Sequence, residues 1–415
     1  MSTETSTANT KARAGNGSRA LTPKRAERDA GRPLSAGPLE RFLPRSTLLR
    51  HLLLALLVMI AITIVLESTG TFRNSQLAAM SYYAIATLGL TLLTGLNGQI
   101  SLGHGALVAV GGYTTALLLD VDDPLLFPVV CLVAIVVTAL VGAVVGAAAA
   151  RLHGPYLAGA TLALAVALPG LALYFSDTLG GEQGLRVTTP RAPDWFDWFI
   201  SWVSGNSVTG SKYLAYVGWA ALAITVFLLT NLVRSRVGRT WRAVRDDEVA
   251  AELAGINLGR TRIQAFVVSA ACAGLAGAVF AVVVRIATPS AFTIVLSLGL
   301  LTAVVLGGLG SLLGAVLGSA VLVFLPQFTT DFGTARGLDD TAAAQLAPLV
   351  YGVVLVLVML LAPAGMVGTV RTRLRGRKRT SAKTTRTNPP EGASGADGNH
   401  RASRASEPVD EKEAP

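Results

Sequence analysis

The sequence holds few charged residues for a chain of 415 residues. Charged side chains make up 14% of it, whereas soluble domains carry about a quarter, and 52% of its residues are hydrophobic. The charge gathers in the first 50 residues, near 234–262 and in the last 50 residues, and apolar runs of about 20 residues lie between them. Because runs of that length cross a bilayer, the composition excludes an ordinary soluble fold.

Cysteine and histidine are also scarce. The two cysteines, Cys131 and Cys272, fall inside apolar runs, and the four histidines stand far apart without the spacing of metal ligands. We therefore expect neither a disulfide framework nor a metal site. The net charge of +10 lies beside apolar runs and lacks the aromatic-rich basic surface of a nucleic-acid-binding fold, so no nucleic acid is expected as a partner.

The apolar segments predict an all-α polytopic membrane protein with about eight to ten transmembrane helices. The lower limit reflects the segments at 105–119 and 312–326, which are short for a full crossing. Polar tails at 1–46 and 369–415 are expected to be disordered and enclose one transmembrane domain at 47–368. The ten segments lie near 49–66, 76–94, 105–119, 126–150, 156–176, 213–232, 263–284, 293–309, 312–326 and 345–362.

The basic residues predict the orientation of the chain. Of the 35 Lys and Arg residues, 29 lie in the first 50 residues, at Arg151, in 234–262 or in the C-terminal tail. Positively charged segments stay on the cytoplasmic side, so we expect both termini and 234–262 inside a bacterial cell (inner) membrane. The loop 177–212 then lies outside, and its aromatic run predicts a helix in the outer interface. Membrane lipid is a further expected partner of the basic tail.

The polar stretch 234–262 has apolar residues at helix-compatible spacings and a charged exterior. A cytoplasmic helix and turn of this kind is suited to docking a partner protein. An ordinary solvated loop would show the same pattern, so both interpretations stay open at this point. The apolar positions are Trp241, Val244, Val249, Leu253 and Ile256.

Gln99, Ser101 and His104 form the densest group of polar residues at membrane depth. Hydrocarbon penalises polar side chains, so such a group is a functional candidate. The glycines around it predict a broken or tightly turned backbone, which is tolerated only against protein or a water-filled cavity. The group either lines or gates a path near the cytoplasmic side, or it is a turn in which His104 is satisfied locally. These glycines are Gly95, Gly98, Gly103 and Gly105.

Gly310, Gly314 and Gly318 form two overlapping G-x-x-x-G steps, which allow helices to approach closely in lipid. The close approach can lie within one bundle or at an interface with another subunit.

Three stretches resemble the permeases of ATP-binding cassette (ABC) importers, and in particular the branched-chain amino acid permease family. The stretch Val249-Ala250-Ala251-x-x-x-Gly255 has the spacing of the family's EAA-x-x-x-G coupling element, with Val249 at the usual Glu position. The stretches GLNGQISLGHGALVAVGGYTTALL at 95–118 and VVLGGLGSLLGAVLG at 304–318 agree with the family as well. The chain is most similar to the M-type subunit.

The resemblance implies a permease that works in a larger complex. It implies a second related permease of H type, two cytoplasmic ATPase subunits and an extracytoplasmic solute-binding protein as partners. The chain itself is then no enzyme and binds no cofactor directly, because ATP is used by the partner subunits. The implied ATPase-coupling residues are Asp246, Asp247, Glu248, Ala250, Ala251 and Gly255.

The resemblance leaves the solute open among branched-chain amino acids, urea, amides, small aromatic acids and related small polar solutes. Relatives often carry polar or acidic residues in the fifth and eighth spans. Here these spans are almost wholly apolar, apart from Thr161, Ser297 and Thr302.

An ion-coupled secondary carrier is the main alternative, since it would also be basic inside. Such carriers usually hold acids within their spans, whereas Glu67, Asp120 and Asp177 all fall at span ends. A phosphate-loop-like stretch from Gly205 to Lys212 places its Lys one position too late and lacks the following Ser or Thr. The sequence therefore favours ATP-driven transport powered by separate subunits. A purely structural scaffold would leave the ordered motifs unexplained.

Overall fold

The structure, a computed structural model, describes residues 47–120, 125–152, 155–204, 208–361 and 365–369. The predicted disordered tails lie outside these residues, except for Thr369. Among the described residues, eight helices are long and apolar enough to cross a membrane. The prediction of an all-α polytopic membrane protein is therefore confirmed. The chain divides into two units, Met1–Leu54 and Ala55–Pro415, and the contacts below belong to the second.

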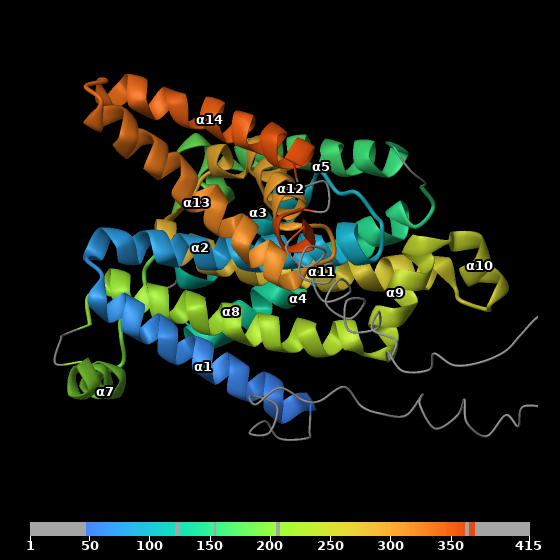
Figure 1. Cartoon of the computed structure of the whole chain (residues 1–415), viewed down its shortest axis with the longest axis horizontal. Coiled ribbons are helices and arrows are strands. Elements are labelled where there is room, and N and C mark those ends of the chain that lie inside the picture. The colour runs from blue at the N-terminus through green and yellow to red at the C-terminus, as the bar shows by residue number, and fades with distance from the viewer. Residues whose placement is uncertain (1–46, 121–124, 153–154, 205–207, 362–364, 370–415) are drawn as a thin grey trace, which may run out of the picture. The chain divides into compact units, whose positions relative to one another are not determined.

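Each predicted apolar segment corresponds to one helix or to a helix with its terminal turn (Figure 1). The ten helices are α1 (Thr47–Ser68), α2 (Thr71–Leu90), α3 (His104–Leu119), α4 (Phe127–Ala149), α5 (Pro155–Tyr174), α8 (Gly210–Arg234), α11 (Leu258–Val284), α12 (Ile294–Gly307), α13 (Leu312–Ala335) and α14 (Asp340–Leu361). The shorter elements are the π-helical turn η3 (Thr91–Leu96), α6 (Ser176–Leu179), the 3-10 turns η4 (Gly181–Gln183) and η5 (Pro289–Phe292), β1 (Leu185–Arg186), α7 (Asp194–Ser204), α9 (Arg236–Asp246), α10 (Glu248–Leu253) and β2 (Ile286–Ala287).

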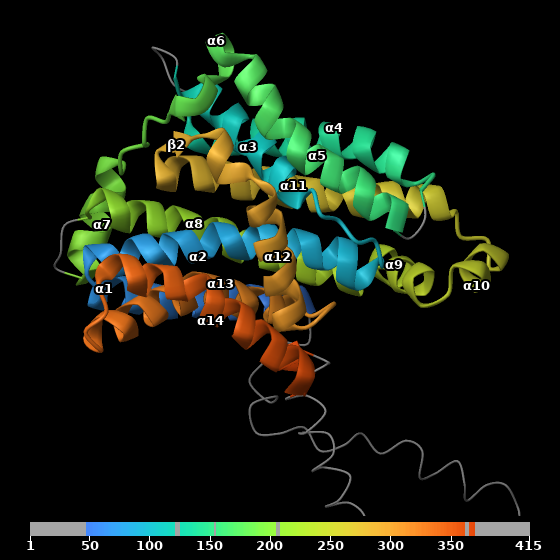
Figure 2. The ribbon, with the colours of Figure 1, turned by 90° about the horizontal axis from the view of Figure 1, so that it is seen from above.

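Helices α2 and α11 form the centre of the bundle. Helix α11 packs against α2, α3 and α4, while α2 packs against α8 and α13 (Figure 2). The protein buries most of the apolar stretch of both helices, whereas α4, α5 and α14 leave most of theirs exposed. Exposed apolar helix faces are stable against lipid, which fits a place for these helices at the outside of the bundle.

Small residues let α11 approach its neighbours closely. A Cβ atom added at Gly277 would lie 2.1 Å from the carbonyl oxygen of Val108 on α3. On α4, a Cβ atom at Gly142 would lie 2.2 Å from the Cβ atom of Ala270. In lipid, backbone contact of this kind holds helices together where further apolar bulk would not.

Helix α13 differs from the short crossing expected at 312–326. It continues to Ala335 with Pro326 inside it and has 24 residues, so that expectation is wrong. The hydroxyl groups of Thr329 and Thr330 donate to the carbonyl oxygens four residues earlier, at 2.9 Å and 3.1 Å. Pro326 has no amide hydrogen for the carbonyl oxygen of Leu322, and these hydroxyls bond instead to the carbonyl oxygens of Leu325 and Pro326.

The two ends of the bundle carry different short elements. Helix α7 lies near the start of α8, and α9 and α10 project from the opposite end of the bundle (Figures 1 and 2). Helix α7 confirms the helix expected from the aromatic run, and its position in a membrane interface stays a prediction. Its three tryptophans are exposed: Trp195, Trp198 and Trp202. Strands β1 and β2 form a two-residue antiparallel ladder at the same end.

A buried ion pair joins α1 to α8 near α7. The Nζ atom of Lys212 lies 2.8 Å from Oε2 of Glu67, and the hydroxyl of Tyr216 donates to Oε1 of Glu67 over 2.9 Å. The Lys212 and Glu67 side chains are 8% and 14% exposed. Lys212, which the sequence placed at the end of a phosphate-loop-like stretch, is therefore engaged in helix packing.

Candidate functional site

The backbone between α2 and α3 is broken at one end of the bundle. Helix α2 widens into the π-helical turn η3, and residues 97–103 are not helical before α3 begins at His104. Gly98 has a φ of +81°, which side-chain-bearing residues rarely adopt. The broken backbone that the glycines predicted is therefore present, and we call residues 95–105 the break.

The three predicted path residues are all buried in the break. Gln99, Ser101 and His104 are at most 5% exposed. The Nε2 atom of His104 lies 3.0 Å from the carbonyl oxygen of Ala86, and since a carbonyl only accepts, Nε2 carries the proton. The side-chain amide of Gln99 donates to the carbonyl oxygen of Arg262 over 3.3 Å and also to the side chain of Asn97.

Several buried polar atoms of the break have no hydrogen-bond partner within the part of the chain that the structure describes. A buried polar atom without a partner costs about 1–3 kcal/mol, so native proteins usually satisfy such atoms. Here they gather in one place and would gain from contact with water or with a polar solute. The atoms are Nδ2 of Asn97, Oε1 of Gln99, Oγ of Ser101 and Nδ1 of His104.

Two polar residues that sequence reasoning had not assigned to the site bind the break. The amide of Leu102 donates to Oγ1 of Thr161 on α5 over 3.0 Å. The amide of Gly105 donates to Oγ of Ser297 on α12 over 2.9 Å. Both hydroxyls supply backbone partners that a regular helix would have provided. Their signal in the sequence was their isolation as polar residues within apolar spans.

The segment 234–262 folds into α9, α10 and the first turn of α11. The side chain of Asp247 caps α10 by accepting from the amide of Ala250 at 3.0 Å. Gly255 ends this helix with a φ of +83°, and a Cβ atom there would meet nothing within 4 Å. The turn therefore requires the backbone freedom of glycine although it has room for a side chain.

Helix α10 presents apolar residues to its surroundings. Val249 and Leu253 are 68% and 85% exposed, and because they are four residues apart they lie on one face of the helix. Ala250 is exposed beside them, whereas Ala251 is buried against the protein. An exposed apolar face on a polar helix is typical of a surface that another protein covers.

The three acidic residues expected to take part in coupling each have a partner within the chain. Asp246 accepts two hydrogen bonds from the guanidinium of Arg245, and Asp247 is the cap of α10. Glu248 forms an ion pair with Arg262, with 2.6 Å between Oε1 and Nη2. All three thus help to hold the shape of the segment.

The predicted packing glycines lie at contacts within this chain. A Cβ atom at Gly314 would lie 2.4 Å from the carbonyl oxygen of Gly307, and one at Gly318 would lie 1.9 Å from that of Ala303. Both contacts join α12 to α13. Gly310 lies in the turn between these helices, where its amide nitrogen faces Gly95 of the break.

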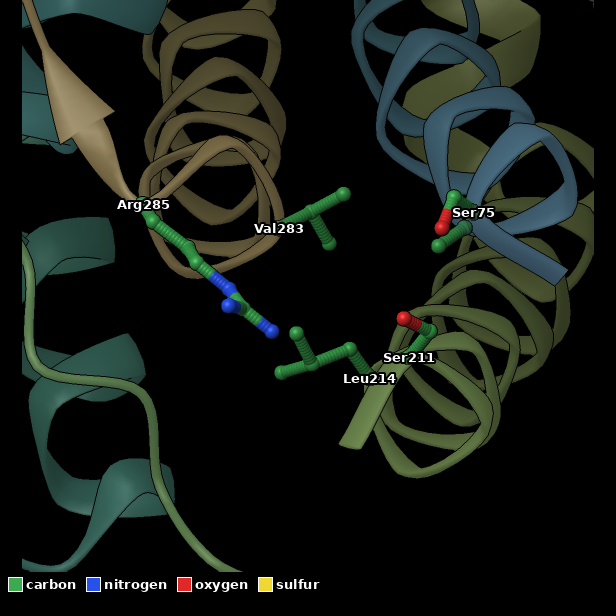
Figure 3. Close-up of a pocket in the computed structure, with 6 residues that line it drawn as sticks. Ser75, Ser211, Leu214, Val283 and Arg285 are labelled. Atoms are coloured by element: carbon green, nitrogen blue, oxygen red, sulfur yellow. The ribbon is translucent and has the colours of Figure 1, made fainter. Parts of the chain in front are cut away.

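A separate cavity of about 210 Å³ lies at the opposite end of α2 and α11. Figure 3 shows the guanidinium of Arg285 on one side of it, and Ser75 and Ser211 on the other. Helix α2 has 20 residues and is therefore about 30 Å long, which separates this cavity from the break. Leu214, Val283 and Ala78 complete its lining.

Apolar spans, a buried polar break within them and an exposed helix pair beside that break define a polytopic membrane protein of the transport class. The family model for the branched-chain amino acid transport system permease component matches residues 74–362. The chain belongs to this family. It is a permease, and this membership favours ABC transport over an ion-coupled carrier.

Individual relatives agree with this assignment. The high-affinity branched-chain amino acid transport system permease protein LivM of Escherichia coli is 31% identical over 338 residues, covering 78% of this chain and 76% of LivM. The corresponding LivH protein of Escherichia coli is 27% identical over 305 residues, covering 69% of this chain and 92% of LivH. The fructose import permease protein FruG of Bifidobacterium longum is 29% identical over 276 residues, covering 63% and 76%. No solved structure matches the chain.

Proposed function

We propose that this permease subunit of an ABC importer carries branched-chain amino acids or a related small polar solute. The observation that carries the proposal is the similarity to LivM, which is named as a high-affinity branched-chain amino acid permease. The similarity to FruG makes a small sugar the second candidate.

Uptake in cells with and without this gene tests the solute. The panel contains radiolabelled leucine, isoleucine, valine, fructose, urea, a short amide and a small aromatic acid. We expect the gene to be needed for leucine, isoleucine and valine uptake. Gene-dependent uptake of fructose alone would establish the second candidate, and gene-independent uptake of the whole panel would refute both.

We propose that the chain works beside a second, related permease, with two cytoplasmic ATPase subunits and an extracytoplasmic binding protein. LivM and LivH of Escherichia coli are separate proteins, and this chain is similar to both, which supports a related partner. Purification of the complex through a tag on this chain should recover all four partner subunits.

We further propose that the segment 234–262 docks an ATPase subunit through the exposed face of α10. Gly255→Trp should distort the turn and abolish co-purification of the ATPase. Gly337→Trp is the matched control, because Gly337 also has a positive φ and open space around it but lies between α13 and α14. Equal recovery of the ATPase with both variants would refute the docking role.

Gln99, Ser101 and His104 are proposed to line or gate the solute path. Their partnerless atoms support this role, since a wet path would satisfy them. Gln99→Leu and His104→Leu should lower solute uptake while the assembled complex keeps its normal abundance. Normal uptake by both variants would identify the break as a structural turn.

The charge distribution supports a cytoplasmic position for both termini and for 234–262. In a background without Cys131 and Cys272, Glu182→Cys should react with an impermeant thiol reagent in intact cells. Ser235→Cys, at the start of α9, should react only after the cells are opened. The reverse pattern would invert the proposed topology.

A further inference from the structure

The segment 234–262 and the break lie far apart in sequence but are joined by two arginines. Arg245 is the second-last residue of α9, and Arg262 lies in the first two turns of α11. Each arginine contacts one residue of 234–262 through an ion pair and one residue of the break through a backbone carbonyl. These contacts form a continuous chain of polar groups from α10 to Gln99.

Arg245 holds the end of the π-helical turn. Its Nη1 donates to the carbonyl oxygen of Gly95 over 2.7 Å, while Nε and Nη2 both donate to Asp246. Carbonyl groups in the last turn of a helix lack partners within the helix, so the guanidinium supplies one. A Cβ atom at Gly98 would lie 3.1 Å from Cγ of Arg245, so this glycine lets the arginine stem lie along the break.

Arg262 joins α10 to the path residue Gln99. Its side chain is 7% exposed and pairs with Glu248, the first residue of α10. Its Nη1 also donates to the carbonyl oxygen of Ala150 at the end of α4 over 3.4 Å. Its own carbonyl oxygen accepts the side-chain amide of Gln99. If α10 moves and Glu248 moves with it, Arg262 is therefore displaced, and Arg262 is the residue that positions Gln99.

The break is also in contact with a second pair of helices. Gly95 faces Gly310, and a Cβ atom at Gly95 would lie 2.2 Å from the Gly310 amide nitrogen. With no side chain on either residue, a shift of Gly95 reaches the turn between α12 and α13 directly. Ser297 of α12 binds the amide of Gly105 at the far end of the break.

We propose that Arg245 at the end of α9 and Arg262, paired with Glu248 of α10, are positioning residues that transmit movements of α9 and α10 to the break, and so couple the ATPase to Gln99 and His104. This role rests on the docking and gating functions proposed above. Coupling between two sites requires an element that both sites bias, and the break has the form of such an element. The arginines act through the backbone of the break and do not contact the solute.

The test compares three variants of the complete complex in proteoliposomes with radiolabelled leucine. Arg245→Met keeps the stem over Gly98 and removes the guanidinium. Glu248→Gln removes the charge that pairs with Arg262 and keeps the length of the side chain. Arg236→Met is the matched control, because the Arg236 side chain is exposed on α9 and has no hydrogen-bond or ion-pair partner among the described residues.

Arg245→Met should keep ATPase co-purification and basal ATP hydrolysis, and both Arg245→Met and Glu248→Gln should raise the ATP consumed per leucine transported about tenfold. Arg236→Met should keep the wild-type ratio, and Arg245→Lys should restore part of it, because its ammonium still reaches a carbonyl. A parallel fall of uptake and ATP hydrolysis at an unchanged ratio would overturn the proposal. So would an unchanged uptake rate.

A second readout needs no solute. In a background without Cys131 and Cys272, Ser101→Cys reports the state of the break by its rate of reaction with a thiol reagent. Trapping nucleotide with vanadate should change that rate in the otherwise unaltered complex and leave it unchanged with Arg245→Met. The same nucleotide effect in both would overturn the role of Arg245. Failure of the docking proposal is distinguishable, because Gly255→Trp would then leave ATPase co-purification intact.

Discussion

The two ends of α2 and α11 use buried charge differently. Near α7, the charged groups of Glu67, the second-last residue of α1, and Lys212, the third residue of α8, bind each other. Near α10, Arg245 and Arg262 reach the neutral carbonyl oxygens of Gly95 and Ala150, where helices have ended. Separating the first pair would strand a buried charge, whereas Asp246 and Glu248, the acidic partners of the two arginines, are 64% and 48% exposed and can exchange a guanidinium for water. One end is therefore suited to hold helices fixed, and the other to let them move.

The largest effect is expected from breaking the ion pair. Lys212→Met leaves the Glu67 carboxylate buried without its cation, and this should lower the free energy of unfolding by about 3–5 kcal/mol. The measurement is unfolding of the purified protein in detergent by titration with a denaturing surfactant. Glu67→Gln together with Lys212→Met removes both charges and should recover most of the loss. If the double variant is as unstable as the single one, the pair does not act as described.

The pairing at this end could not be predicted from the sequence. Hydropathy located all the long helices, because each must bury an apolar stretch of sufficient length in lipid. It carried no information on which helices lie side by side, so Glu67 and Lys212 were seen only as a span end and a phosphate-loop fragment. Their separation of 145 positions is closed by the packing of α1 on α8.

The break was more predictable than its surroundings. The sequence predicted the break from Gly95, Gly98 and Gly103, because glycine is the residue that permits tight turns and close approach. The partners of the break could not be predicted from the sequence, because Thr161, Ser297 and Arg245 lie on three other elements. The same holds for the acids of 234–262, whose pairing with arginines became clear only when α9, α10 and α11 were placed together.

A smaller loss is expected when only the hydrogen bond to the pair is removed. Tyr216→Phe deletes the hydroxyl that donates to Glu67, and hydrogen bonds to charged groups contribute about 1.5–3 kcal/mol. The control is Tyr213→Phe, since Tyr213 packs against Phe196 as Tyr216 does but is more exposed. We expect the control to stay within about 0.5 kcal/mol of the wild type in the same surfactant titration. Equal effects of the two substitutions would show that ring packing, and not the bond to Glu67, sets the stability.

At the break, the next largest effect on the free energy of unfolding is expected from steric crowding. A Cβ atom at Gly103 would lie 2.2 Å from the carbonyl oxygen of Thr161, so Gly103→Ala should cost about 1–3 kcal/mol by overpacking. Gly70→Ala, at the start of α2, is the control at the other end, because no atom lies within 4 Å of its added Cβ. The two midpoints of unfolding should differ clearly, with the control close to wild type. A tolerated Gly103→Ala would mean that α5 moves freely away from the break.

The smallest expected effect is a gain in stability beside the cavity near α7. Arg285 ends α11 with a φ of +67° and is the one described residue other than glycine with a positive φ. A residue with a side chain costs about 1–2 kcal/mol in that conformation. Glycine avoids this cost, but its greater freedom in the unfolded chain offsets part of the gain in stability. Arg285→Gly should therefore raise the free energy of unfolding by up to about 1 kcal/mol.

A substitution in the opposite direction, from glycine to a residue with a side chain, can be compared with Arg285→Gly in the same unfolding titration. Gly337 has a φ of +87° and open space around it, so Gly337→Ala should lower the free energy of unfolding by about 1 kcal/mol through the conformation alone. Opposite shifts of the two variants in one titration would show that backbone strain is the cause. If Arg285→Gly instead destabilises the protein, the guanidinium contributes more to this end than its strained backbone costs, and charge there stabilises the fold beyond the Glu67 pair.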